Sequence, residues 1–395
     1  MKIWFITRSY PPLKGGGPLM RELQVNFLKR KYDVEIITIN HNSNEFIQKD
    51  GITYIPYTTN KYLKRINIIL EMFGIIKDSH TLWIKNVISY LKGKIKDGDI
   101  TFSTTGGELA CMIIGNEIKK INSNIKHIIN YHDLLDYGNY KGERVYKNFH
   151  ISIDNIEKEI LENADFILTN SNVMTEFISD KFSFVKNKID KLYFGFINNY
   201  ITINNKVIDN NRKIKIANIG SASYLQSPDI LIKAYELLPK NLQEQFELVY
   251  IGDANFNKKI KNKNNIITFD YMNREELIKY AVKETDYAFV SLINIIPFKP
   301  AMPTKFYEYI GLELPIIGVL PENSEASQVI KKYGFGYNCV HGDIECLKKI
   351  LVNIANNKDK YEYFKSNLRK YKNLFNSENT LKTMYDVVEN LKNAN

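Results

Sequence analysis

Three side chains at the start of a predicted helix have the chemistry to bind an anionic ligand. Thr304, Lys305 and Glu308 lie in the segment P-T-K-F-Y-E-Y-I-G-L-E-L-P-I-I, residues 303–317. At about 100° per residue, Thr304 and Glu308 share one helix face and Lys305 lies beside them. The unpaired N–H groups of a helix N-terminus favour an anion, and a carboxylate can accept from two vicinal hydroxyls. A surface helix with a capping Thr and a Lys–Glu pair is the alternative interpretation.

The flanking residues predict the elements that hold these side chains. Pro303 suits a first helical turn, because its φ is already helical and its missing N–H needs no partner there. Phe306 and Ile310 point to the opposite side of the helix, where they can pack on a core. The apolar run L-P-I-I, which ends at Ile317, indicates a buried strand after the helix.

A glycine-rich loop near the start of the chain is a second candidate for binding an oxyanion. Residues 2–7, 8–18, 19–31 and 33–40 have the pattern of a strand, a loop, a helix and a strand, which is a parallel βαβ unit. The loop begins with Arg8 and contains Gly15, Gly16 and Gly17. Such glycines let a ligand approach the backbone and leave N–H groups for it. A flexible turn is an equally good interpretation of the loop alone.

Another pair of polar residues ends a predicted buried strand. Residues 127–133, H-I-I-N-Y-H-D, finish with His132 and Asp133. Open α/β sheets bind ligands at the carboxyl ends of parallel strands, so this pair is a candidate catalytic site. A His–Asp pair satisfied within its own loop is the alternative. Residues 97–99, D-G-D, are interpreted as a turn entering a strand and not as a metal motif.

The pattern of strands and helices restarts after a polar, Asn-rich stretch at 198–211. The elements predicted after it are strands at 213–220, 246–252, 266–269 and 287–291 and helices at 227–238 and 274–282. Gly220 and Gly252 end two of these strands. The alternation predicts an α/β fold with two Rossmann-like, doubly wound parallel sheets, one in residues 1–200 and one in residues 201–375.

Composition agrees with two globular domains in a reducing compartment. The 395 residues are 44% hydrophobic and 25% charged, and the length suits two domains of roughly 200 residues each. Three cysteines without framework or metal spacing fit a reducing cytoplasm. The N-terminus has no separate apolar signal core, and the longest apolar stretch, 66–76, is too short to span a bilayer. We therefore expect a cytoplasmic protein.

The formal net charge of +10 favours a polyanionic partner, although a lysine-rich composition explains it equally well. Residues 61–96 predict two basic helices with large apolar side chains, which could lie on anionic lipid at the inner face of a membrane. Packing of these apolar faces in the core is the alternative. No interleaving of aromatic and basic residues indicates a nucleic-acid binder.

The pattern P-x-K-x-x-E-Y-x-x-x-x-x-P-I-I in residues 303–317 resembles the donor-site segment of family 4 of the retaining glycosyltransferases. The resemblance implies the GT-B fold, in which two Rossmann-like domains face an interdomain cleft. The N-terminal domain would bind the acceptor, the C-terminal domain would bind a nucleotide-sugar, and a last helix, 376–395, would cross back to the first domain. In this family Glu308 would bind the ribose hydroxyls, and the helix start at Thr304 and Lys305 would face the phosphates and the sugar.

The resemblance extends to the first half of the chain. The loop with Arg8 and the three glycines is similar to the family's glycine loop, which lies against the donor phosphates or the acceptor. His132, followed by Asp133, resembles the family's histidine that contacts the donor sugar near the reacting carbon. Gly220 and Gly252, at strand ends of the second sheet, would belong to the donor site.

Several positions depart from the family's pattern. Ser221 and Gln226 stand where the family has an Arg and a Lys that hold the donor diphosphate, and Pro300 replaces a second Glu. Glu313 stands where a glycine usually ends the donor helix, and Gly311 lies two residues earlier. Because a Glu at positive φ costs about 1 kcal/mol, we expect a differently shaped turn there.

Two missing cations leave three explanations open. Lys305, with Arg8 or Lys299, supplies the lost charge; or the donor carries one phosphate, as a CMP-linked acidic sugar does; or the protein has lost activity. The loss of the two cations matters because a charge-assisted hydrogen bond to phosphate is about twice as strong as a neutral one.

The sequence thus favours a glycosyltransferase of polysaccharide biosynthesis. It would move a sugar from a nucleotide-sugar to a glycan or lipid-linked glycan, with retention, without a metal and without a further cofactor. A nucleotide-sugar epimerase on the same architecture is an alternative enzyme class, although His132 and Asp133 lack the paired Glu that proton abstraction would favour. A non-catalytic glycan- or nucleic-acid-binding protein is the third hypothesis.

Overall fold

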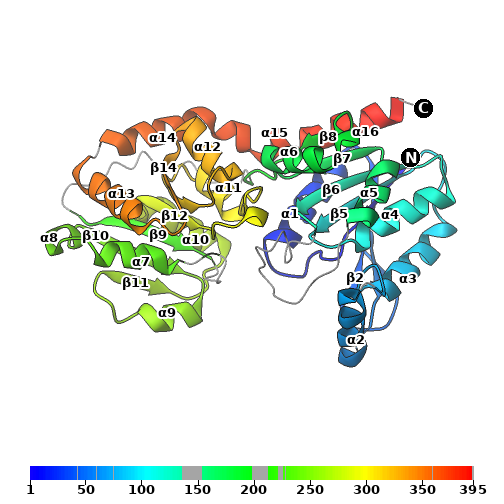
Figure 1. The fold of residues 1–395 in the computed structure, drawn as a ribbon, viewed down its shortest axis with the longest axis horizontal. Coiled ribbons are helices and arrows are strands. Elements are labelled where there is room, and N and C mark those ends of the chain that lie inside the picture. Colours follow the sequence, from blue (N-terminus) through cyan, green and yellow to red (C-terminus); the bar gives the residue numbers. More distant parts are fainter. Residues whose placement is uncertain are drawn as a thin grey trace. The chain divides into compact units, whose positions relative to one another are not determined.

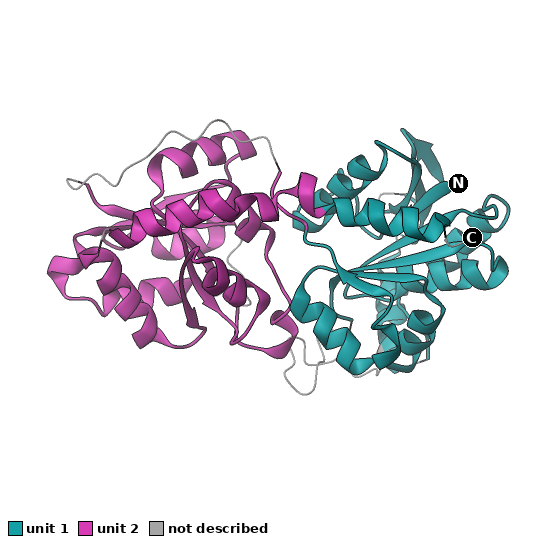
Figure 2. Cartoon of the chain, turned by 90° about the horizontal axis from the view of Figure 1, so that it is seen from above, with its two compact units in different colours: residues 1–193, 381–395 teal, residues 194–380 magenta. Residues whose placement is uncertain are grey.

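The chain folds into two compact units (Figures 1 and 2). The structure, a computed structural model, describes residues 1–41, 43–58, 60–73, 75–135, 154–197, 212–220, 226, 228–357 and 359–393. Unit 1 comprises Met1–Tyr193 with Leu381–Asn395, and unit 2 comprises Phe194–Thr380. The expected linker at 198–211, with the expected domain boundary inside it, lies outside the described residues.

Unit 1 contains an eight-stranded sheet with the order β3-β4-β2-β1-β5-β6-β7-β8. The strands are β1 (Lys2–Ile6), β2 (Asp33–Asn40), β3 (Ile47–Lys49), β4 (Ile52–Pro56), β5 (Ile100–Gly106), β6 (Lys126–Asp133), β7 (Phe166–Thr169) and β8 (Ile189–Lys191). All neighbours pair in parallel except β3 and β4. The strand order reverses direction beside β1, which is the switch point of a doubly wound sheet.

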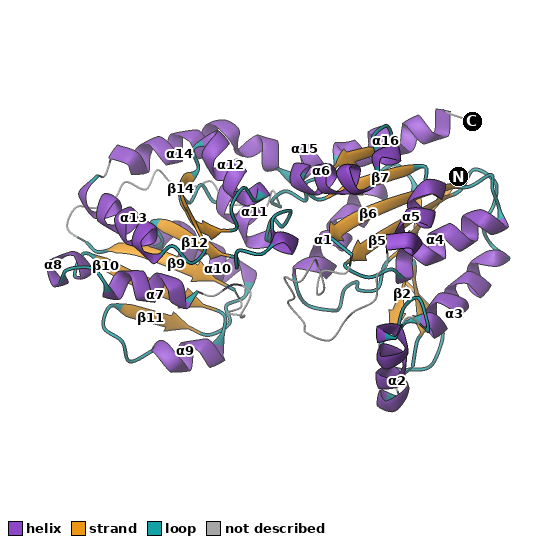
Figure 3. Ribbon diagram, in the orientation of Figure 1, coloured by secondary structure: helices purple, strands orange, loops and turns teal. Residues whose placement is uncertain are grey.

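Helices cover both faces of this sheet (Figure 3). They are α1 (Gly16–Leu28), α2 (Lys61–Met72), α3 (Thr81–Lys92), α4 (Ala110–Ile121), α5 (Asp154–Asn163), α6 (Asn172–Lys181), the 3-10 turn η2 (Ser183–Val185) and α16 (Lys382–Asn393). Successive side chains of β1 point to opposite faces. Ile3 and Phe5 pack in a core with α1 and α16, whereas Trp4 and Ile6 pack in a core with α3 and α4.

The last helix completes unit 1. Leu381, Met384 and Val388 are buried in the same cluster as residues of β1 and α1. The Tyr385 hydroxyl donates to the Phe27 carbonyl oxygen, and the two rings stack with centroids 4.3 Å apart. The two ends of the chain therefore build one core.

Unit 2 contains a six-stranded, all-parallel sheet with the order β11-β10-β9-β12-β13-β14. The strands are β9 (Ile214–Ile219), β10 (Phe246–Ile251), β11 (Ile266–Phe269), β12 (Tyr287–Ser291), β13 (Ile316–Leu320) and β14 (Gly336–Val340). The helices are α7 (Asp229–Glu236), α8 (Lys240–Gln243), α9 (Ala254–Ile260), α10 (Arg274–Glu284), η4 (Ile296–Phe298), α11 (Thr304–Gly311), α12 (Glu325–Tyr333), α13 (Ile344–Asn356), α14 (Asp359–Tyr371), η5 (Lys372–Phe375) and α15 (Ser377–Thr380). The prediction of two doubly wound α/β sheets is confirmed.

Two local predictions are wrong. Helix α1 begins at Gly16 and not at Leu19, so Gly16 and Gly17 form its first turn and only Gly15, with φ 127°, is left-handed. The turn after α11 keeps the shape that a glycine would take, because Glu313 adopts φ 54°. Its carboxylate accepts from Arg369 Nε at 3.1 Å and from Lys372 Nζ at 2.6 Å. These two charge-assisted bonds offset the strain of the left-handed backbone.

The two basic helices predicted in residues 61–96 are present as α2 and α3 and differ in their packing. Trp83, Ile84, Val87 and Leu91 of α3 are buried in the core, so the core interpretation is right for this helix. No described side chain of α2 is buried. Within the described residues, no helix has the length and apolar character needed to cross a membrane.

Candidate functional site

Two arginines and two carboxylates gather in unit 1 where β1, β5 and β6 end. Arg21 of α1 is buried and donates from Nε to Thr104 Oγ1 at 3.2 Å and from Nη1 to Ser9 Oγ. Nε of Arg8 lies 3.2 Å from Oε1 of Glu108. This edge of the sheet is where a doubly wound fold binds ligands.

Gly106, the last residue of β5, marks the centre of this cluster. A Cβ there would lie 3.2 Å from Arg21 Nη2, 3.5 Å from Glu108 Oε2 and 3.8 Å from Asp133 Oδ2. The Glu108 carboxylate also accepts from the Gly106 N–H at 2.9 Å. Burial, followed by the charge of Glu108, raises the pKa of Asp133 to about 6.

His132 is held beside this cluster in one tautomer. Its Nε2 lies 3.0 Å from Asn130 Oδ1, which also accepts from Gln24 Nε2 at 2.9 Å. An amide oxygen only accepts, so His132 Nε2 carries the proton. Burial, with the charge of Arg21, lowers the pKa of His132 well below its usual value. The ring is therefore neutral near pH 7.

The glycine loop leads directly into the start of α1. No side chain caps this helix at Gly15, so the first N–H groups of the helix are left for other acceptors. A Cβ on Gly17 would lie 3.1 Å from Arg21 Nη1. The structure thus brings the glycine loop and the arginine cluster to the same part of unit 1.

In unit 2, α11 presents the side chains that the sequence analysis singled out. Phe306 and Ile310 are buried, and the Tyr309 hydroxyl accepts from the Ile219 N–H at 3.3 Å, so the helix is fixed to the end of β9. Lys305 and Glu308 are only partly buried. Pro303 precedes the helix and no side chain caps it, so its N-terminus favours an anion.

Lys305 meets the residue that stands in place of a family cation. Its Nζ donates to Gln226 Oε1 at 3.2 Å, and the Gln226 carbonyl oxygen accepts from Ser291 Oγ. Burial lowers the pKa of Lys305 to about 8. Gly220 and Gly252 approach each other where β9 and β10 end, because a Cβ on Gly252 would lie 3.5 Å from the Gly220 backbone. Ser221, another predicted donor residue, lies outside the described residues.

Glu308 pairs with an arginine that the sequence analysis missed. Arg274 Nη2 lies 2.9 Å from Oε1 and 3.1 Å from Oε2 of Glu308. Burial acts to raise the pKa of the Glu308 carboxyl, and the Arg274 guanidinium, which contacts both carboxylate oxygens, acts in the opposite direction by favouring the ionised form. Arg274 is the first residue of α10, behind the N-cap Asn273. A cation in the first helical turn opposes the helix dipole, and this is the signal that could have indicated a role for Arg274.

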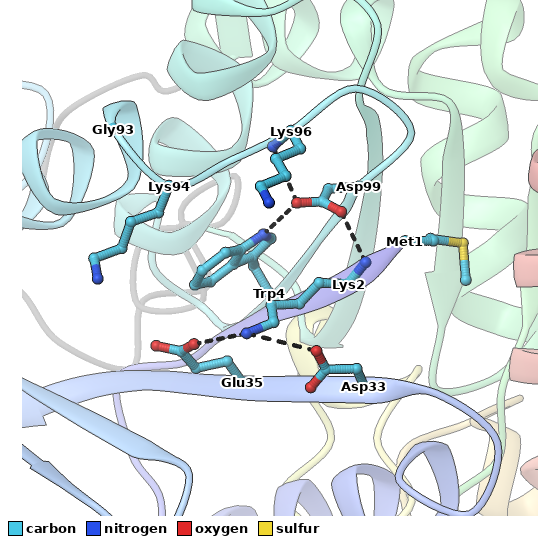
Figure 4. A pocket seen from close by; sticks show the side chains of 9 residues that line it. All are labelled: Met1, Lys2, Trp4, Asp33, Glu35, Gly93, Lys94, Lys96 and Asp99. Carbon is cyan, nitrogen blue, oxygen red and sulfur yellow. Dashed lines mark hydrogen bonds and ion pairs between the residues drawn. The ribbon is translucent and has the colours of Figure 1, made fainter.

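A hollow at the opposite edge of the unit 1 sheet is lined by residues whose contacts are mostly structural (Figure 4). Lys2 Nζ lies 3.2 Å from Glu35 and 3.6 Å from Asp33. Asp99 accepts from the Lys2 N–H at 2.7 Å and from Trp4 Nε1 at 3.1 Å. These contacts fasten the amino ends of β1, β2 and β5, and they agree with the interpretation of residues 97–99 as a structural turn.

The chain is similar to one protein family in part of its sequence and to several solved structures in its fold. Residues 201–371 match the family model described as glycosyl transferases group 1. No curated protein matches the sequence. The fold is similar to that of WaaG, a glycosyltransferase involved in lipopolysaccharide biosynthesis, at a TM-score of 0.66 and 14% identity over 98% of this chain and 99% of that one.

Two further solved structures are similar over nearly the full length. Sucrose-phosphate synthase from Thermosynechococcus elongatus aligns with a TM-score of 0.71 and 14% identity over 100% of both chains. HepE of Anabaena in complex with UDP aligns with a TM-score of 0.66 and 13% identity over 99% of this chain and 100% of that one. These likenesses establish the GT-B fold, and residues 201–371, in the second half of the chain, are similar to glycosyl transferases group 1.

Proposed function

We propose that this glycosyltransferase moves a sugar from a nucleotide-sugar to a glycan or lipid-linked glycan acceptor, with retention of configuration and without a metal. The observation that carries the proposal is the arrangement at α11. An acidic side chain, Glu308, and a cation, Lys305, flank an uncapped helix N-terminus, and Tyr309 of the same helix accepts from the N–H of Ile219, the residue before Gly220 at the end of β9. A carboxylate suits the vicinal hydroxyls of a ribose, and the helix N-terminus with a cation suits a phosphate.

Unit 2 supplies one cation, Lys305, near the positions where the family pattern would place two after Gly220. Lys305 reaches the position of Gln226, and Arg274 reaches Glu308. The position of Lys305 supports the first of the three explanations, in which Lys305, with Arg8 or Lys299, supplies the missing charge. In our proposal Lys305 and the N–H groups near Thr304 hold phosphate, and Arg274 favours the ionised form of Glu308, which accepts from the ribose. Helix N-termini and cations then stabilise the leaving phosphate without a metal.

Unit 1 supplies groups for the sugar and the acceptor. His132 is neutral, with its proton on Nε2, and would contact the donor sugar near the reacting carbon. Asp133, beside Arg21, is ionised near pH 7. Arg8 and the loop of Gly15, Gly16 and Gly17 would lie against phosphate or acceptor oxygens. No side chain needs to form a covalent intermediate, because the leaving phosphate can accept the acceptor's proton.

The acceptor and its location complete the proposal. A lipid-linked glycan would be met at the inner face of a membrane by a cytoplasmic enzyme, and the basic character of the chain suits an anionic surface. The UDP bound in HepE makes uracil the first base to test. A CMP-linked acidic sugar remains the alternative donor, since Lys305 is a single cation beside the α11 N-terminus.

Calorimetric titration with UDP, GDP and CMP tests the donor site directly. We expect one nucleotide to bind the wild type and to lose at least about tenfold in affinity with Glu308→Ala, since a charge-assisted pair contributes about 1.5–3 kcal/mol. Glu345→Ala is the matched control, because Glu345 is exposed on α13 and pairs with Lys348 of the same helix. CMP binding alone would select the monophosphate donor.

Activity is then measured with a panel of nucleotide-sugars carrying the preferred base. Transfer to an acceptor, or slow hydrolysis of the donor, should depend on Glu308 and not on Glu345. Wild-type protein that binds no nucleotide and acts on no donor would refute the proposed function.

A further inference from the structure

Helix α2 of unit 1 is oriented with its apolar face toward solvent. At about 100° per residue, four large side chains of this helix and its C-cap fall within an arc of about 60°. They are Tyr62, Ile66, Ile69 and Phe73, with exposed fractions of 76%, 48%, 50% and 76%. Leu63 and Ile68, with 46% and 38% exposure, lie outside the arc, one on each side of it. Isolated exposed apolar residues are ordinary, whereas a contiguous apolar helix face is typical of an interaction site.

The opposite, polar face of α2 makes the contacts with the rest of unit 1. Asn67 Nδ2 donates to the Tyr57 hydroxyl at 3.4 Å. Lys64 Nζ lies 5.7 Å from the centre of the Tyr57 ring, and the carboxyl of Glu71 hydrogen-bonds to Ser79. This is the reverse of an ordinary surface helix, which buries its apolar face and exposes its polar face. Figure 1 shows α2 at the margin of unit 1.

The charges on α2 specify the kind of surface that the apolar face fits. The helix carries three cations, Lys61, Lys64 and Arg65. Lys61 and Arg65 are exposed and lie on the same side of the apolar arc. Glu71, the one acidic residue of α2, points to Ser79 on the other side. An apolar face bordered by cations, with aromatic side chains near both ends, has the chemistry of a helix that lies in the interface of an anionic bilayer.

We propose that α2 is an interfacial helix that binds unit 1 to an anionic lipid surface through Tyr62, Ile66, Ile69 and Phe73. Its apolar side chains enter the boundary between headgroups and acyl chains, and Lys61 and Arg65 pair with lipid phosphates. The inference names the membrane-contacting surface within the proposed function. It requires neither a nucleotide nor an acceptor, so it is tested without the donor site.

Sedimentation with vesicles tests the proposal. Full-length protein is mixed with vesicles of phosphatidylcholine alone or of phosphatidylcholine with phosphatidylglycerol, at low and at high salt. We expect binding to the anionic vesicles and weaker binding at high salt. Ile66→Ser with Ile69→Ser should weaken binding about tenfold or more, since two buried apolar side chains are lost. Lys61→Gln with Arg65→Gln should weaken it about fivefold per cation.

Tyr363→Ser is the control, because Tyr363 is an aromatic residue of α14 in unit 2 with 59% exposure. It should bind vesicles as the wild type does. All four proteins should unfold at the same temperature, since the substituted side chains are exposed. Wild-type protein that ignores anionic vesicles, or α2 variants that bind them equally well, would overturn the proposal. Self-association in the absence of lipid that disappears with Ile66→Ser and Ile69→Ser would assign the face to a second copy instead.

Discussion

Nη2 of Arg274 contacts both carboxylate oxygens of Glu308, at 2.9 Å and 3.1 Å. Arg274 is the first residue of α10, and Glu308 lies in α11, 34 positions later in the chain. Burial disfavours the ionised form of Glu308, and the guanidinium favours it. In our proposal the pair prepares an acceptor for two ribose hydroxyls.

Removing the guanidinium should shift nucleotide binding to higher pH. In Arg274→Gln nothing opposes the effect of burial, so the Glu308 carboxyl takes up a proton at higher pH than in the wild type. We expect about tenfold weaker binding of the preferred nucleotide at pH 7, with recovery toward pH 9. Calorimetric titration across this pH range measures the shift. Arg274→Lys keeps the charge and should show a smaller change; identical pH curves for wild type and Arg274→Gln would contradict the role.

Protonation of Asp133 should make the transfer rate fall at acidic pH, which appears as an acidic limb in the pH–rate profile. Burial raises the pKa of this carboxyl to about 6, so it is ionised above that pH and neutral below it. If its charge acts on the sugar or through Arg21, the rate falls as the pH drops through about 6. We expect Asp133→Asn to lower the rate about tenfold or more and to remove this limb. A wild-type limb that persists in Asp133→Asn must come from another group.

Glu313 should contribute to the stability of unit 2 through its charge and not through its backbone. Glu313→Ala keeps a side chain at φ 54° and removes the partner of Arg369 and Lys372. We expect it to lower the free energy of unfolding by about 2 kcal/mol. Glu313→Gly loses the same contacts but relieves about 1 kcal/mol of strain. Chemical denaturation should therefore rank wild type above Glu313→Gly and Glu313→Ala lowest; an Ala variant more stable than the Gly variant would refute the strain.

His127 should make unit 1 sensitive to acid. Its ring is fully buried against Gly115 and Ser103, and burial, with the charge of Lys119, lowers the pKa of His127 to about 3. The unfolded chain takes up this proton near pH 6.5, whereas the folded chain does so only near pH 3. Stability is therefore lost as the pH falls below about 6.5, by up to about 1.4 kcal/mol per pH unit.

The contribution of this single group is found by comparison with His127→Gln. Denaturation at a series of pH values between 7 and about 4.5 should show a steeper loss of stability in the wild type than in the variant. Above pH 7 the difference between the two proteins should be constant. Parallel pH dependences would mean that His127 does not titrate as its burial implies.

Much of the sheet architecture could be predicted because strand signals are local. The alternation and apolar runs placed β2, β11 and β12 at the residues where the structure has them. A helix that begins near Pro303 and Thr304 was also predicted, although the sequence did not decide its first residue, because Pro303 and the spacing of Phe306 and Ile310 are all within one segment. The family resemblance predicted that the two sheets belong to a GT-B fold, and the comparisons with solved structures confirm this fold.

Contacts between distant residues could not be predicted in the same way. No local pattern pairs Arg274 with Glu308, and nothing in the glycine loop indicates Arg21 on the next helix. The turn at Glu313 was wrongly predicted because its two partners, Arg369 and Lys372, are more than 50 positions away, at separations of 56 and 59. The periodicity of α2 showed an apolar face but not its direction, which depends on the contacts of Asn67 and Glu71.

The return of α16 to unit 1 determines the order in which the protein can mature on the ribosome. The cluster around Ile3, Phe5 and Phe27 is closed by Met384 and Val388, which are translated after the whole of unit 2. Until then, the face of the unit 1 sheet that carries Ile3 and Phe5 is covered by α1 but not by α16, while the six described strands of unit 2 have all been synthesised. The half that is synthesised first is thus the half that finishes last, and a stop codon placed after Thr380 would leave it permanently incomplete.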